Sequence, residues 1–157
     1  MSEFGKHLAK IRRWTAMQER CIVEVKIHCR ALGIADKDAD KIISHLQEEG
    51  FIDEERFAKL YAGGKFRNKK WGRDRIIGEL GARQISDENI RTGLGEIDEE
   101  EYRKLIVSML EHKISITDNT NMLLFKHRLA KPAITKGFEP ELVNEIIDEL
   151  MKKKGIK

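Results

Sequence analysis

The chain contains the same hydrophobic pattern three times. In each copy a turn residue and a large apolar residue precede a stripe spaced as i, i+3, i+4, which is one face of an α-helix. The first copy is Gly33, Ile34, Ala39, Ile42, Ile43 and Leu46, the last is Gly137, Phe138, Val143, Ile146, Ile147 and Leu150, and a looser middle copy is Gln84, Ile85, Ile90, Gly93 and Leu94. Such self-similarity predicts a protein of tandem helical repeats.

A second block recurs between the stripes. Residues 52–57 read Ile-Asp-Glu-Glu-Arg-Phe, and residues 97–102 read Ile-Asp-Glu-Glu-Glu-Tyr. Together the two patterns define a repeat of about 50 residues and three helices. They predict three repeats, at 1–52, 53–97 and 98–157, which share their cores because one unit alone buries little surface. We therefore expect an all-α protein of three tandem three-helix repeats that form an elongated, curved molecule.

Helix boundaries follow from periodicity, capping residues and helix stops. We expect helices near residues 6–20, 22–32, 36–49, 53–69, 72–83, 87–95, 98–114, 119–136 and 140–153. The third helix of the middle repeat should be the shortest, because that copy lacks six residues. Asp53, Ser86 and Asp98 are expected N-caps, and Pro132 is expected to kink or interrupt its helix.

Composition favours a soluble, helical protein of the cytoplasm. Charged residues make up 36% of the 157 residues, against roughly 25% in typical soluble proteins, and aromatic residues make up 6%. On one helix Cys21 and Cys29 would lie about 12 Å apart, which is beyond disulfide reach, so we expect both to be reduced. We expect no signal peptide and no membrane-spanning segment.

The sequence offers no catalytic or metal-binding constellation. The five histidines are scattered, and neither they nor the cysteines have the spacing of a zinc site. Gly63-Gly64-Lys65 is followed by Phe66, where a phosphate-binding loop needs Ser or Thr, so the two glycines favour close helix packing instead. We therefore expect a protein that is not an enzyme and that needs no cofactor.

The densest cluster of basic residues lies in the middle repeat. Its cations are Lys65, Arg67, Lys69, Lys70, Arg73 and Arg75. Such a surface can neutralise phosphates, or it can simply keep a long helix solvated. Trp71, within the cluster, is more typical of a core residue than of a stacking platform. Acidic residues gather at 48–55 and 96–101, where they compensate helix dipoles or contact a basic partner.

Three segments carry a family resemblance that covers about residues 15–153. The most specific is Glu-Gly-Phe-Ile-Asp-Glu-Glu-Arg-Phe-Ala at 49–58, followed by the basic stretch and by Trp-Gly-Arg-Asp-Arg-Ile-Ile-Gly-Glu-Leu at 71–80. With Gln-Glu-Arg-Cys at 18–21 and the stripe after Gly137, it resembles the RecX family, which regulates the RecA recombinase. Leu32 and Arg83-Gln84 depart from the family, which usually has Lys-Gly there.

The resemblance implies both a fold and a function. The fold is three curved, tandem three-helix repeats. The function is binding along the RecA–DNA filament, with inhibition of strand exchange and ATP hydrolysis, without a catalytic site and with weak direct binding to single- or double-stranded DNA. We expect a monomer in which the six cations contact the filament or its DNA.

Two other functions are compatible with the residues. A stand-alone DNA-binding protein with a helix-turn-helix inside a repeat would bind DNA without a recombinase and with a steep salt dependence. A helical-repeat scaffold for another protein would bind little DNA and leave recombination unchanged.

Overall fold

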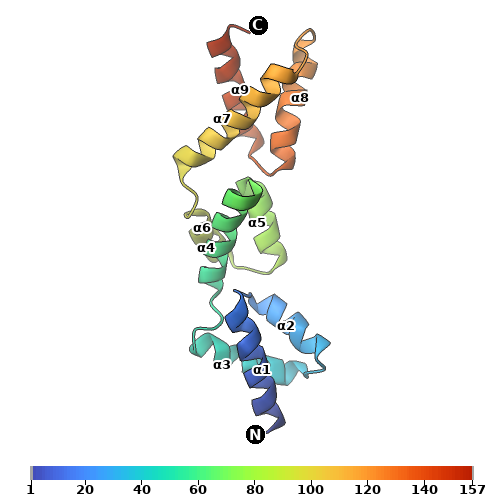
Figure 1. Cartoon of the computed structure of the whole chain (residues 1–157), viewed down its shortest axis with the longest axis vertical. Helices are drawn as coiled ribbons and strands as arrows, with labels where there is room; N and C mark the ends of the chain where they lie inside the picture. Colours follow the sequence, from blue (N-terminus) through green and yellow to red (C-terminus); the bar gives the residue numbers. More distant parts are fainter. Residues whose placement is uncertain (1, 157) are drawn as a thin grey trace. The chain divides into compact units, whose positions relative to one another are not determined.

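The computed structural model describes residues 2–156 and is helical throughout (Figure 1). Within this range there is no β-strand, so the all-α prediction is confirmed. The elements in chain order are α1 (Glu3–Met17), α2 (Ile22–Ala31), α3 (Asp36–Glu48), α4 (Glu54–Gly64), the π-helical segment η1 (Lys65–Lys69), α5 (Arg73–Ala82), α6 (Asp87–Leu94), α7 (Glu99–Ile116), α8 (Met122–Thr135) and α9 (Pro140–Lys154).

The chain divides into two compact units. The first unit is Met1–Tyr61 with Leu80–Gly93, and the second is Ala62–Glu79 with Leu94–Lys157. The borders of the units therefore fall inside α4, inside α5 and before the last residue of α6. The three repeats at 1–52, 53–97 and 98–157 describe the pattern of the sequence, and their boundaries stay a prediction.

In the first unit, α1, α2 and α3 pack against one another (Figure 1). They bury the predicted stripe of α3, in which Ile42 and Leu46 are fully inaccessible. The rest of this core comes from all three helices and from the segments that follow α2 and α3: Ile11, Val25, Cys29, Ile34, Ala39, Ile43 and Ile52. Because the stripe lies on one face of α3, its opposite face is left to polar residues.

In the second unit, α7, α8 and α9 form a second bundle (Figure 1). The last copy of the stripe, from Val143 to Leu150 in α9, is buried as predicted. Three aromatic side chains, Tyr102, Phe125 and Phe138, complete the interior and are at most 1% exposed. The rings of Tyr102 and Phe138 lie 5.2 Å apart, centroid to centroid.

The middle copy of the pattern has the shortest third helix, as predicted. Helix α6 has 8 residues, against 13 in α3 and 15 in α9. Gly93 of α6 stands where the other copies have Ile42 and Ile146. A Cβ at Gly93 would lie 2.6 Å from the backbone oxygen of Ala58 in α4. The close approach of α4 thus leaves no room for a side chain at this position of the stripe.

Local capping follows the sequence prediction at three helix starts. The side chains of Asp53, Ser86 and Asp98 accept hydrogen bonds from the backbone N–H three residues later, at 3.0, 3.1 and 2.9 Å. Gln84 takes the left-handed conformation, with φ +58°, that glycine has in the other two copies. Of the two effects predicted for Pro132, an interruption is excluded, because α8 continues through Pro132 to Thr135, and a kink stays a prediction.

Candidate functional site

Five of the six predicted cations lie on the outside of one turn in the second unit. Lys65, Arg67 and Lys69 belong to η1, Lys70 follows it, and Arg75 lies in the first turn of α5. The turn forms because Lys70 adopts φ +57° and its N–H bonds to the carbonyl of Phe66, at 3.1 Å. Phe66 itself is buried and so anchors the turn from beneath.

The structure brings two of these cations to the same aromatic ring. The Lys65 ammonium lies 5.1 Å from the centroid of the Trp71 indole, and the Arg75 guanidinium lies 4.2 Å from it. Each such contact contributes about 0.5–1 kcal/mol at an exposed site. Trp71 is half-buried, not the core residue that the sequence favours, and it holds Lys65 and Arg75 together on the turn.

Arg73 has a different place from its five neighbours. Its guanidinium lies 3.9 Å from the ring centroid of Tyr102, pairs with Glu139 at 3.0 Å and also pairs with Glu99. The side chain is only 17% exposed. Arg73 is therefore a structural residue that joins α5 to the starts of α7 and α9, and it is not available to a partner as the sequence suggested.

Tyr102 completes this internal network. The Tyr102 hydroxyl accepts a hydrogen bond from the backbone N–H of Arg73, at 3.0 Å, and donates one to the Glu139 carboxylate. Burial and the Glu139 carboxylate raise the pKa of Tyr102 above its ordinary value, so the hydroxyl keeps its proton and stays a donor.

The turn also rests directly on the backbone between α8 and α9. Gly72 N–H donates to the carbonyl of Lys136, and Asp74 N–H donates to that of Gly137, both at 2.9 Å. A Cβ on Gly72 would lie 2.2 Å from the Phe138 nitrogen, so only glycine permits this approach. The basic turn is therefore held on a fixed base.

Lys136 is a cation of this surface that the sequence did not reveal. Its ammonium donates to the carbonyl of Lys69 at 3.4 Å, although the two residues are 67 positions apart. No local pattern connects Lys136 to the basic stretch. We use the name basic turn below for Lys65, Arg67, Lys69, Lys70, Arg75 and Lys136.

Some of the acidic residues at helix starts bond to other parts of the protein. The Glu54 carboxylate accepts a hydrogen bond from Ile22 N–H at the start of α2, at 3.0 Å, and burial raises the pKa of Glu54. Glu99 pairs with Arg73 at the start of α5. Since both carboxylates face the first turn of another helix, they stabilise helix starts, which supports the structural interpretation of these acidic residues.

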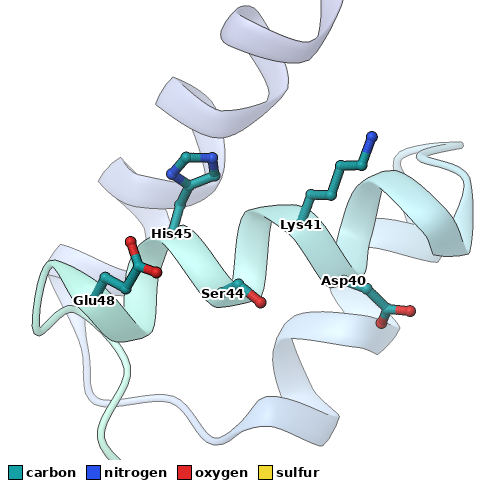
Figure 2. Close-up of a pocket in the computed structure, with 5 residues that line it drawn as sticks. All are labelled: Asp40, Lys41, Ser44, His45 and Glu48. Carbon is teal, nitrogen blue, oxygen red and sulfur yellow. The ribbon is translucent and has the colours of Figure 1, made fainter.

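A polar hollow on α3 offers no catalytic arrangement. It has a volume of about 280 Å³ and is lined by Asp40, Lys41, Ser44, His45 and Glu48. Figure 2 shows that Asp40 and Lys41 point away from each other instead of converging on one point. Across residues 2–156 no group of three His, Cys, Asp or Glu side chains is arranged to hold a metal ion. Nor is any helix of that range long and apolar enough to cross a membrane.

Comparison with protein families and curated proteins gives consistent matches. A family model described as the second three-helix domain of RecX matches residues 53–94. The Regulatory protein RecX of Lactobacillus johnsonii is 24% identical over 92% of this chain and 58% of its own length. That of Geobacillus kaustophilus is 24% identical over 79% of this chain and 46% of its own length. The chain thus spans about half the length of these two relatives.

Two solved structures share the fold. The crystal structure of RecX from Lactobacillus salivarius matches 94% of this chain and 96% of its own with a TM-score of 0.83 and 20% identity. A second crystal structure of regulatory protein RecX matches 92% of this chain and 71% of its own, with a TM-score of 0.81 and 16% identity. The family model, the relatives and the shared fold all match RecX proteins, and they support placing this chain in the RecX family of regulatory proteins.

Proposed function

We propose that this chain binds the RecA–DNA filament through the basic turn and inhibits strand exchange and ATP hydrolysis by the recombinase. The observation that carries the proposal is the basic turn itself. Arg67, Lys69, Lys70 and Arg75 are exposed, while the backbone beneath them is fixed on the α8–α9 turn. Because the backbone is already fixed, only the side chains must be ordered when these cations meet phosphates, and each contact releases counterions.

Inhibition follows from the same binding. A ligand that binds only the assembled filament stabilises that assembly by mass action. It then opposes the rearrangements of protomers that strand exchange and nucleotide turnover require. Because the proposal needs no reacting group on this chain, the role is regulatory and not catalytic.

The test is a triple charge reversal, Arg67→Glu, Lys69→Glu and Lys70→Glu. These side chains are exposed, so the substitutions should change the free energy of unfolding by less than about 0.5 kcal/mol each. Binding to RecA filaments, assembled on DNA with a slowly hydrolysed nucleotide, is measured at several salt concentrations. We expect weaker binding and a salt dependence flattened by up to about three units of log–log slope.

The matched control is Lys152→Glu, Lys153→Glu and Lys154→Glu at the end of α9. It changes the net charge by the same amount on exposed residues of the same unit. If both triple variants lose filament binding equally, net charge alone explains the effect. If the first variant binds as the wild type does, the basic turn is not part of the interface. Equal affinity for naked DNA and filament would instead favour the stand-alone DNA-binding function.

A further inference from the structure

A groove with cationic rims runs between α7 and α8, apart from the basic turn. Each helix contributes a stripe with i, i+3, i+4, i+7 spacing. The α7 stripe is Met109, His112, Lys113 and Ile116, and the α8 stripe is Leu124, His127, Arg128 and Lys131. Two adjoining hollows, of about 690 and 330 Å³, share Lys113, Ile116 and Pro132 as lining residues. The groove is therefore continuous along the pair of helices.

The floor of this groove exposes apolar side chains. Ile116 is 63% exposed and Leu124 is 42% exposed, and both line the larger hollow together with Pro132. Since Ile116, Leu124 and Pro132 line the same hollow, one bound ligand can contact all three. Covering Ile116 and Leu124 would stabilise a complex in proportion to the apolar area removed from water.

The rims of the groove carry positive charge that the protein itself does not neutralise. Lys113, Arg128 and Lys131 have no ion-pair partner among residues 2–156, whereas Lys126 on another face of α8 pairs with Asp148 at 3.3 Å. Asp118 is the one acid among the residues that line the larger hollow. Its carboxylate already accepts hydrogen bonds from the backbone N–H and the hydroxyl of Thr120, at 3.0 and 3.2 Å.

We propose that the α7–α8 groove binds an acidic amphipathic peptide segment of a partner protein. One or two large apolar side chains of the segment lie on Ile116, Leu124 and Pro132. Its carboxylates pair with Lys113, Arg128 and Lys131 on the rims. The proposal does not depend on the basic turn or on filament binding, because it uses other residues and another class of ligand.

The mixture of apolar floor and cationic rim decides between the possible occupants. A phosphate backbone would satisfy the three cations but would leave Ile116 and Leu124 facing charged, hydrated groups. A purely apolar helix would cover the floor but would desolvate the cations without pairing them, which is costly. An amphipathic acidic segment satisfies both surfaces, in the manner of helix-in-groove recognition.

The experiment measures binding of a fluorescein-labelled synthetic peptide with glutamates on one helix face and leucines on the other. A peptide of the same composition in scrambled order tests whether amphipathicity matters. Two variants test the groove: Arg128→Glu with Lys131→Glu for the rim, and Ile116→Ser with Leu124→Ser for the floor. Lys153→Glu with Lys154→Glu on α9 is the charge-matched control. Circular dichroism verifies the fold of each variant.

We expect the wild type and the α9 control to bind the amphipathic peptide equally well. The rim and floor variants should each weaken binding by about tenfold or more, and the scrambled peptide should bind less tightly. Three results would overturn the proposal: no binding at millimolar peptide, binding unaffected by both groove variants, or equal binding of the scrambled peptide. If a single-stranded oligonucleotide binds, and only the rim variant weakens its binding, the ligand of the groove is nucleic acid. Self-association lost in both groove variants would assign it to a second copy of this chain.

Discussion

Replacing Gly72 by alanine tests the packing of the basic turn against the turn between α8 and α9. An alanine Cβ would lie 2.2–2.4 Å from backbone atoms of Gly137 and Phe138, which is far inside van der Waals contact. Backbone cannot rotate away as a long side chain can, so α5 and the α8–α9 turn must separate. Overpacking of this kind costs roughly 1–3 kcal/mol.

The separation also weakens the two hydrogen bonds that Gly72 and Asp74 make to this turn, both at 2.9 Å. A backbone hydrogen bond contributes about 0.5–1.5 kcal/mol net. The total loss for Gly72→Ala is therefore about 2–6 kcal/mol. Against a usual stability of about 5–15 kcal/mol, this is a large fraction.

Gly78→Ala is the matched control, because Gly78 lies in α5, the helix that begins directly after Gly72, with nothing within 4 Å of an added Cβ. There alanine should increase the free energy of unfolding by about 0.5–1 kcal/mol through helix propensity. Urea denaturation followed by circular dichroism measures both variants. Similar midpoints for Gly72→Ala and Gly78→Ala would refute the close approach of the two backbones.

Three further predictions concern stability and reactivity. Tyr102→Phe removes a hydroxyl with one neutral and one charged hydrogen-bond partner and should lower the free energy of unfolding by about 2–4 kcal/mol in urea denaturation. Gln84→Gly removes the steric cost of a side chain at positive φ and should raise the free energy of unfolding by up to about 1 kcal/mol. Gln47→Gly, inside α3, is the control and should lower the free energy of unfolding by about 1 kcal/mol. A change of the same sign in both variants would contradict this reasoning. Burial raises the pKa of Cys21 to about 11 from 9.0 and also raises that of Cys29. A thiol reagent should therefore modify the native protein at least about 100-fold more slowly than the urea-unfolded protein, and the contribution of Cys21 to stability should persist below pH 9 and be lost towards pH 11.

The local pattern of the sequence was sufficient to predict the helices. The stripe of α3 and its copy in α9 are buried as their spacing requires. Asp53 and Asp98 cap the helices that they precede. These features depend on residues within one or two helical turns, so their physical causes lie within a short stretch of sequence. The shortening of α6 likewise follows from the missing residues.

Local spacing did not predict which charged residues face the solvent. Arg73 belongs to the basic stretch by sequence, yet Glu139, 66 positions later, pairs with it. Lys136 joins the basic turn from a distant helix end, and Trp71 is placed by contacts with two cations. Pro132 does not end α8 as local sequence rules would suggest, because the helix continues through it to Thr135.

The sequence by itself determined that this protein is built from repeated three-helix patterns with a basic stretch in the middle copy. The tertiary structure alone decided which of those cations are held inside and which are presented outward. The reason is physical: helix formation depends on neighbours three and four positions apart, whereas exposure and ion pairing depend on side chains brought together by packing. Gly72 is an example. Its lack of a side chain allows the backbone of Gly137 to pack against it, and only the tertiary structure shows that the two residues meet.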